Sequence, residues 1–339
     1  MQHLLARLYA AAARRRRRYF ATHPSARRRL RCPVVSVGAL SAGGSGKTPV
    51  AAVVARRLVA MGERPALLSR GYRRADPVEG VVVVRDHSTV RGTLETAGDE
   101  PWMLAQQLDG VAVVVASDRH LAGTLAESHL GATVHVLDDG FQHFALERCV
   151  DLVVVRPHDL EDAVLPAGKL REALTTAVEA DAVLVVDPDA GVRAGVAERL
   201  GVTTCFGVTT TLQPPVVRSP AAAEEQVLVG VPVFAVAGIA DPGRFVRDLS
   251  SAGWAPVGSA LFPDHHPYTE ADIQRCVRQA AAAGAELIVT TEKDWVRSAR
   301  WFPSTVQVAV ACLETKVEPA GGFDRLLAER LAIAREHAA

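Results

Sequence analysis

Residues 38–49 read GALSAGGSGKTP, a glycine-rich stretch that ends in Lys-Thr-Pro. It follows the apolar run PVVSV at residues 33–37 and precedes VAAVVARRLV at residues 50–59, whose apolar spacing predicts a helix. A glycine-rich loop between a strand and a helix is typical of phosphate binding, because its backbone N–H groups and the helix N-terminus attract anionic oxygens. The stretch therefore predicts a P-loop NTPase-like α/β fold that handles a nucleoside triphosphate.

The loop supplies candidate ligands for phosphates and for a metal ion. In loops of this kind Lys47 would reach the terminal phosphates, and the Thr48 hydroxyl would bind Mg²⁺. The strict pattern has Gly six residues before the Lys, where this chain has Ser41, and a plain glycine-rich turn is the alternative. The predicted phosphate-binding residues are Ser41, Ala42, Gly43, Gly44, Ser45, Gly46, Lys47 and Thr48.

The composition is that of a globular protein with a large core. Of the 339 residues, 49% are hydrophobic and 22% are charged, and this length suggests about two domains. The five cysteines are scattered and have no CxxC spacing. This argues against a disulfide framework and against a zinc site, and it fits a reducing compartment.

Residues 1–31 form a strongly basic arm. They contain ten Arg and no acidic residue, which leaves 28 basic and 38 acidic residues, a net charge of −10, in residues 32–339. Apolar residues recur at helical spacing over residues 4–12, before RRRRR at residues 14–18. This pattern is typical of a helix that lies on an anionic membrane surface, with a nucleic-acid arm or a solvated basic tail as alternatives. No apolar run approaches the roughly 20 residues that span a bilayer.

Behind the arm, short apolar runs alternate with helical patterns, which predicts a mostly parallel sheet flanked by helices. Residues 212–226 are rich in Pro and Ala and break this pattern. We therefore expect a basic amphipathic membrane-associating segment at 1–31, a P-loop domain at 32–215 and a second, smaller α/β domain at 216–339. Ligands of such sheets bind beyond the carboxyl ends of the strands, so polar residues there are the site candidates.

Asp138 and Asp139 directly follow the apolar run TVHVL at residues 133–137. A phosphate-loop enzyme needs a carboxylate there, near the loop threonine, to hold Mg²⁺ or its waters. A turn or helix cap is the alternative, since Asp-Gly is also a turn signal. Gln142 and His143 follow and add polar groups beside the same cleft.

Two further segments offer acid–base groups. Asp99, in Gly-Asp-Glu-Pro, either caps the helix that follows or acts as a general base. The segment Asp264-His265-His266 resembles a base or metal-ligand cluster, in which a histidine can orient an aspartate base. Solvated loop histidines are the alternative, and two adjacent histidines rarely bind one ion together.

Several basic residues follow apolar runs and suit an anionic substrate, although each one singly is more often a surface charge. Glu172 is either an additional metal ligand or an ion-pair partner. The TEKD segment at residues 291–294 is out of register with the guanine-reading motif, so we expect at most a nucleotide or domain-interface contact there. The basic candidates are Arg70, Arg73 and Arg74 around Gly71 and Tyr72, then Arg119, Lys169 and Arg171.

Taken together, these segments resemble the tetraacyldisaccharide 4'-kinase family, the lipid A 4'-kinases of Gram-negative bacteria. The matching motifs, from about residue 34 to residue 294, are VSVGALSAGGSGKTP, LSRGYRR, AGDEP, DDGFQH, LPAGKLRE, VAGIADPGRF, FPDHH and TTEKD, in the family order. The family also has Ser or Thr where the strict loop pattern has Gly. This chain departs from it at Lys169, where Pro is frequent, and in its more Arg-dense N-terminal segment.

The resemblance implies an ATP- and Mg²⁺-dependent kinase of lipid A biosynthesis. Its acceptor would be the 4'-hydroxyl of an acylated glucosamine disaccharide 1-phosphate, and its product lipid IVA. Residues 32–215 would be the kinase domain. The enzyme would be peripheral at the cytoplasmic face of the inner membrane, whose lipid surface would hold the basic arm.

The resemblance also implies roles for individual residues. Asp99 would be the base that takes the proton of the sugar hydroxyl, His265 its partner, and Lys47 the third catalytic residue. The implied metal ligands are Thr48, Asp138, Asp139 and Glu172. The implied substrate contacts are Arg70, Gly71, Tyr72, Arg119, Gln142, His143 and Arg171.

A membrane-associated P-loop switch ATPase is the main alternative. The loop of that class has an additional Lys where this chain has Ala42, and such an ATPase needs neither GDEP nor DHH. A metallochaperone or GTPase would have a metal-handling segment and a guanine motif, and the sequence has neither. Nucleic acid is not an expected partner, because aromatic residues make up only 5% of the chain. The sequence predicts no oligomeric state.

Overall fold

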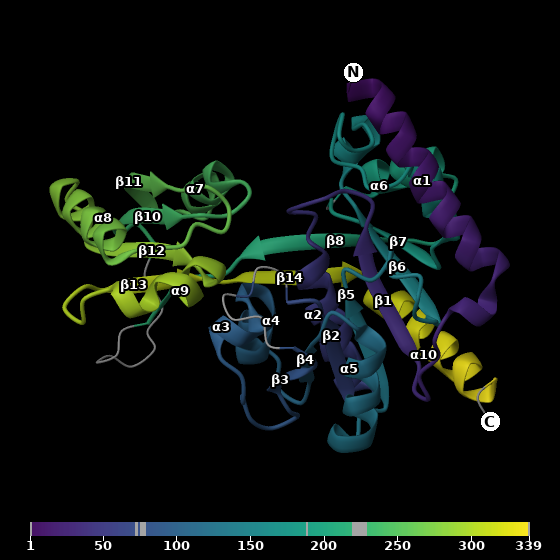
Figure 1. Cartoon of the computed structure of the whole chain (residues 1–339). Helices are drawn as coiled ribbons and strands as arrows, with labels where there is room; N and C mark the ends of the chain where they lie inside the picture. Colours follow the sequence, from purple (N-terminus) through teal and green to yellow (C-terminus); the bar gives the residue numbers. More distant parts are fainter. Residues whose placement is uncertain (1, 72–73, 75–78, 188, 219–228, 338–339) are drawn as a thin grey trace. The chain divides into compact units, whose positions relative to one another are not determined.

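The computed structural model in Figure 1 describes residues 2–71, 74, 79–187, 189–218 and 229–337. The chain forms two compact units, which are Met1–Thr209 together with Thr315–Ala339, and Thr210–Glu314.

The second unit ends earlier than the sequence predicted. We expected it to cover 216–339, but residues 315–339 belong to the first unit. β14 (Leu313–Glu318) lies beside β8 (Cys205–Leu212) in the large sheet, and α10 (Ala320–Glu336) buries its apolar side in the core of that unit. The prediction was wrong at this end, because nothing in the local composition marks a chain that returns to an earlier sheet.

The first unit is built on a sheet with the spatial strand order β14-β8-β7-β6-β1-β5-β2-β4-β3. Neighbouring strands from β8 to β4 run parallel, and β3 is antiparallel to β4. β1 lies between β5 and β6, so the loop after β1 starts at a topological switch point (Figure 1). The other strand bounds are β1 (Val34–Ala39), β2 (Pro65–Ser69), β3 (Val82–Arg85), β4 (Ala112–Val115), β5 (Val134–Asp138), β6 (Val150–Val155) and β7 (Ala182–Val185).

Helices cover both faces of this sheet, which is why its strands are apolar on both sides. Val50, Val54 and Leu58 of α2 are fully buried against Val35 and Val37 of β1, because a spacing of four residues puts them on one face of the helix. The helices of this unit, besides α10, are α1 (Gln2–Thr22), η1 (Pro24–Ala26), α2 (Lys47–Ala60), α3 (Leu94–Ala97), α4 (Asp99–Gln107), α5 (Arg119–Leu125), η2 (Ala126–Leu130), η3 (Pro157–Glu161), η4 (Leu174–Glu179) and α6 (Ala190–Leu200).

The second unit is a smaller α/β layer with the strand order β11-β10-β12-β13-β9. Its strands pair in parallel except β9, which is antiparallel to β13. The predicted fold class, a mostly parallel P-loop sheet flanked by helices with a smaller α/β unit, is confirmed. The elements are β9 (Val216–Val217), β10 (Pro232–Ala237), α7 (Pro242–Ser251), β11 (Ala255–Leu261), α8 (Glu270–Ala282), β12 (Leu287–Thr291), α9 (Glu292–Ser298), η5 (Ala299–Trp301) and β13 (Val308–Ala311).

The basic arm is mostly the helix α1. Leu4, Leu5, Leu8 and Tyr9 are between 41% and 64% exposed, so the apolar side of its first half has no partner among the described residues. Among the described helices, none is long and apolar enough to cross a bilayer.

Candidate active site

The P loop connects β1 to α2 and has the geometry of a phosphate cradle. Gly43 and Gly46 have φ of 74° and 88°, a left-handed conformation that favours glycine. The N–H groups of the first turn of α2 have no intrahelical acceptor and are available to an anion. Ser45 Oγ is buried and has no hydrogen-bond partner among the described residues. The loop is anchored at Ala42, whose N–H donates to the Lys169 carbonyl at 2.8 Å.

Thr48 and Asp138 form the centre of the predicted metal site. The Thr48 hydroxyl lies 3.3 Å from both carboxylate oxygens of Asp138, at the end of β5. Burial raises the pKa of Asp138 to about 7, and the charge of Glu100 adds to the effect while Lys47 opposes it. A carboxylate that is destabilised in this way gains most from a bound cation.

Glu100 is a site residue that the sequence analysis missed. Its Oε2 accepts a hydrogen bond from Thr48 Oγ1 at 3.5 Å, which places a second carboxylate beside Asp138. The sequence did contain a signal, because Glu100 is adjacent to Asp99 in the GDEP motif. The sequence analysis assigned a role in this motif to Asp99 alone.

Asp139 has a different environment from Asp138. Its φ of 59° is in the left-handed region, which costs a non-glycine residue energy. Its carboxylate accepts from Arg171 Nη1 at 2.7 Å and lies 4.0 Å from Lys47 Nζ. Gln142 joins this group, because its Oε1 lies 3.5 Å from Arg171 Nη1 and its Nε2 donates to the Ala39 carbonyl. Four predicted site residues therefore meet at the carboxyl end of β1.

Asp99 is the first residue of α4, and the position before the helix is occupied by Gly98. The alternative interpretation of Asp99 as the residue that caps this helix is therefore wrong. Its predicted role as a base remains a prediction, and Glu100 fixes its segment beside Thr48.

Arg119 is a buried cation with Arg70 and His143 close to it. Arg119 is only 6% exposed, and burial lowers its pKa, as does the charge of Arg70. Burial and the charge of Arg119 likewise lower the pKa of His143 to about 4. Gly71, which follows Arg70, is described with φ of 66°, whereas Tyr72 lies outside the described residues. Cations held close together in this way suit a phosphate group.

His265 lies in the second unit, where its φ of 60° is again left-handed. Its Nε2 is 3.2 Å from Lys293 Nζ and 3.8 Å from Asp264 Oδ2. The next histidine, His266, instead has its Nε2 3.1 Å from Asp272 Oδ2, so the two histidines have different carboxylate partners. Asp99 belongs to the other unit, and its pairing with His265 remains a prediction.

Asp294 of the TEKD segment has a structural role. Its buried carboxylate accepts from the Gly238 N–H at 3.0 Å, from Tyr268 Oη at 3.0 Å and from Thr291 Oγ1 at 2.7 Å. These bonds connect the ends of β10 and β12 within one unit. The predicted contact of Asp294 with a nucleotide is not supported by this arrangement.

Glu172 is engaged by the arm rather than by Thr48. Its two carboxylate oxygens accept from Nε and Nη2 of Arg17. Of the two interpretations that the sequence left open, ion-pair partner and metal ligand, these contacts support the first. The partner is Arg17 and not the adjacent Arg171.

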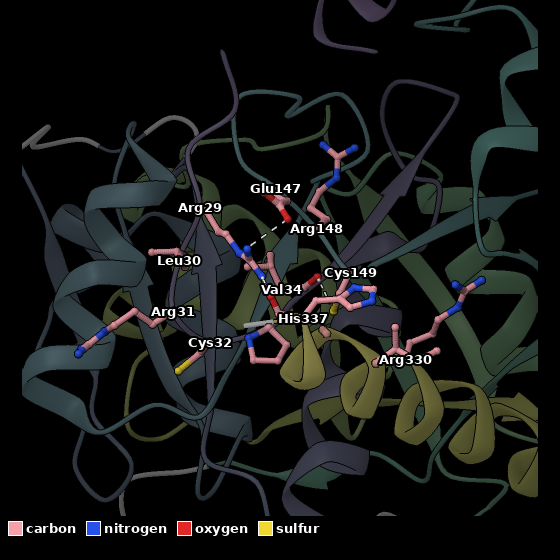
Figure 2. Close-up of a pocket in the computed structure, with 13 residues that line it drawn as sticks. Arg29, Leu30, Arg31, Cys32, Val34, Glu147, Arg148, Cys149, Arg330 and His337 are labelled. Carbon is pink, nitrogen blue, oxygen red and sulfur yellow. Dashed lines mark hydrogen bonds and ion pairs between the residues drawn. The ribbon is translucent and has the colours of Figure 1, made fainter. Parts of the chain in front are cut away.

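The described residues also line a cavity of about 230 Å³ at the opposite end of β1, shown in Figure 2. Cys32, Val34 and Cys149 form part of its wall, whereas the P loop begins beyond Ala39 at the other end of the strand. The cavity is therefore separate from the phosphate site.

Comparison with known proteins agrees with this geometry. The profile of the LpxK family, described as tetraacyldisaccharide-1-P 4'-kinase, matches residues 2–332. The chain belongs to this family. The tetraacyldisaccharide 4'-kinase of Desulfotalea psychrophila is 37% identical over 309 residues, with 86% of each chain covered. That of Pelobacter propionicus is 41% identical over 275 residues, which cover 80% of this chain and 75% of the relative.

A solved structure is similar over almost its whole length. It is LpxK from Aquifex aeolicus in complex with ATP, with a TM-score of 0.76 and 28% sequence identity, covering 96% of this chain and 97% of that one. The family predicted from the motifs, and with it a kinase of lipid A biosynthesis, is confirmed.

Proposed function

We propose that this kinase transfers the γ-phosphate of ATP to the 4'-hydroxyl of a tetraacyldisaccharide 1-phosphate. The observation that carries the proposal is the group formed by Thr48, Asp138 and Glu100 at the start of α2, directly after the glycine-rich loop. Backbone N–H groups, the unpartnered Ser45 hydroxyl and Lys47 would hold the phosphates there.

Mg²⁺ fits this group of side chains. Two carboxylates lie beside one hydroxyl, and burial together with the neighbouring charge makes the ionised form of Asp138 unfavourable without a cation. Thr48, Asp138 and Glu100 would hold the ion, with Asp139 nearby. When bound, Mg²⁺ neutralises charge on the phosphate oxygens.

The protein's own groups would supply positioning and the proton acceptor. Asp99, at the start of α4, would take the proton of the sugar hydroxyl as its oxygen attacks the phosphorus, and His265 would orient Asp99. Arg119 and Arg70 would bind the 1-phosphate of the acceptor through their positive charge, which burial strengthens at Arg119. His143, whose low pKa leaves its imidazole neutral, would contribute a hydrogen bond. Gly71, Tyr72, Gln142 and Arg171 are the further proposed substrate contacts.

The arm would hold the enzyme at the cytoplasmic face of the inner membrane. The exposed apolar side chains Leu4, Leu5 and Leu8 precede exposed arginines on the same helix. This combination of apolar contact and positive charge is what binds helices to anionic bilayers.

The test is transfer of labelled γ-phosphate from ATP to tetraacyldisaccharide 1-phosphate in detergent, with wild type and Asp99→Ala side by side. We expect labelled lipid with the wild type and a loss of about 10²- to 10⁴-fold in kcat with the variant, at unchanged ATP affinity. ATP hydrolysis that is independent of the lipid would instead favour a switch ATPase.

A further inference from the structure

Arg17 differs from the other arginines of its run. It is 8% exposed, whereas Arg14, Arg15, Arg16 and Arg18 are all exposed. The helix α1 thus leaves four of these arginines exposed and buries one in its own unit, although the guanidinium carbon of Arg16 also lies 5.6 Å from the ring centre of Phe144. Burying a guanidinium is costly unless it is fully paired, so the partners of Arg17 indicate what the contact is for.

The partners are two carboxylates and two aromatic rings. Arg17 bonds both oxygens of Glu172, and its Nη1 donates to Glu179 Oε2 at 2.7 Å. Its guanidinium carbon lies 4.6 Å from the ring centre of Phe141 and 4.8 Å from that of Phe144, within the range of cation–π contact. Burial alone would lower the pKa of Arg17, but the two carboxylates outweigh it and raise the pKa.

Two of these partners, Phe141 and Glu172, belong to the two segments that build the site. Phe141 is fully buried two residues after Asp139, in the DDGFQH segment. Glu172 is adjacent to Arg171, whose Nη1 bonds the Asp139 carboxylate at 2.7 Å. One side chain of the arm therefore touches both segments, which also contact each other through Arg171 and Asp139.

We propose that Arg17 is a positioning residue that fixes the arm to these two segments, so that Asp139 and Arg171 stay in register with the P loop. The inference rests on the proposed function of the site. The arm would then have two separate roles. The exposed first half of α1 would bind the membrane, and the buried Arg17 would position the two site segments.

The geometry requires arginine at this position. Only a planar guanidinium with several N–H groups can bond two carboxylates and stack on rings at the same time. Lysine would keep the charge opposite Glu172 but lose most of the bonds and the stacking. Arg15, which is exposed on the same helix, provides a matched control for loss of one positive charge from the arm.

The experiment compares full-length wild type, Arg17→Met, Arg17→Lys and Arg15→Met. Lipid phosphorylation in detergent gives kcat and KM, titration gives the affinity for ATP, thermal melting reports folding, and sedimentation with phosphatidylglycerol-containing vesicles reports membrane binding. We expect Arg17→Met to lower kcat about 10-fold or more, because small displacements of positioned groups are costly. Its ATP affinity and vesicle binding should stay within about twofold of wild type. Arg15→Met should keep kcat, KM and ATP affinity within the same range.

Arg17→Lys keeps the test informative if Arg17→Met does not fold, and its kcat should also fall. A wild-type kcat in either folded Arg17 variant would overturn the inference, as would a loss of vesicle binding with kcat in detergent unchanged. Failure of the wild type to phosphorylate the lipid would refute the proposed function instead.

Discussion

Arg119 should affect stability and activity in opposite directions. In the free protein its guanidinium is buried next to the charge of Arg70, and its Nη1 bonds the Ser117 carbonyl at 3.1 Å. Because this environment disfavours the charged form, replacing Arg119 by Met, which has a similar length and no charge, should stabilise the folded protein. A gain of about 1 kcal/mol corresponds to a rise in Tm of about 2–4 °C for a unit of this size.

The same substitution should impair turnover of the lipid. A hydrogen bond from a charged donor contributes about 1.5–3 kcal/mol. Losing the bond between Arg119 and the phosphate of the acceptor should therefore lower kcat/KM for the acceptor roughly 10- to 150-fold. The affinity for ATP should be unchanged, since the P loop is intact. The assay is lipid phosphorylation at varied acceptor concentration, together with thermal melting of the same preparations.

A matched control is Arg85, which is also buried but is paired with Asp109 at 2.8 Å and with the Ala105 carbonyl at 2.9 Å. Arg85→Met should lower Tm, because it leaves paired groups without their donor. If Arg119→Met lowered Tm as much as Arg85→Met and kept wild-type kcat/KM, the assignment of an anion site around Arg119 would be wrong.

Three further predictions concern the metal site, a buried carboxylate and the arm. Glu100→Gln should raise the Mg²⁺ concentration needed for half-maximal activity about 10-fold, measured by Mg²⁺ titration, because it removes one negative charge beside Thr48. Glu127 is buried, which raises its pKa, but its bond to His135 and other donors outweigh this and lower the pKa to about 2. The stability that Glu127 contributes is therefore present above its ordinary pKa and lost as the pH falls toward 2, so Glu127→Gln should cost about 1–2 kcal/mol at pH 7 and less at pH 3 in urea unfolding. Deleting residues 2–12, which are largely exposed, should reduce sedimentation with anionic vesicles while kcat in detergent stays near wild type.

Each of these predictions has an outcome that would contradict it. An unchanged Mg²⁺ requirement in Glu100→Gln would mean that the Glu100 carboxylate does not bind the metal. A stability difference for Glu127→Gln that is equal at pH 7 and pH 3 would mean that the loss is not electrostatic. Undiminished vesicle binding after the deletion would mean that another surface carries the membrane contact.

The sequence predicted the parts of the site that depend on local patterns. The P loop, its strand and its helix were predicted because glycine spacing and apolar periodicity act over a few residues. Asp138 was predicted because it ends a strand, and parallel strands bring their carboxyl ends to one edge. Glu100 was missed, since its role depends on where the start of α4 lies relative to Thr48, and such a tertiary contact leaves no periodic pattern in the sequence.

The arginine run illustrates the limit of pattern analysis more sharply. Arg14 to Arg18 are identical in sequence and differ only in the direction that the helix gives each side chain. With about 3.6 residues per turn, five consecutive side chains point in different directions around the helix. Which one is buried depends on the rotation of α1 against Phe141 and Glu172, more than 120 residues away in the chain. The charge of the arm was thus predictable, whereas the burial of Arg17 was not.

Backbone strain gives a second reason why composition alone cannot define the site. Among the described residues, the non-glycine residues with left-handed φ are Asp139 and His265. Glycine at either position would relieve the backbone, yet the chain keeps a carboxylate at one and an imidazole at the other. Such strain persists only where surrounding contacts enforce it, as Arg171 and Lys47 do for Asp139 and Lys293 and Asp264 do for His265. Each unit therefore holds one of these side chains in a costly conformation through contacts within that unit.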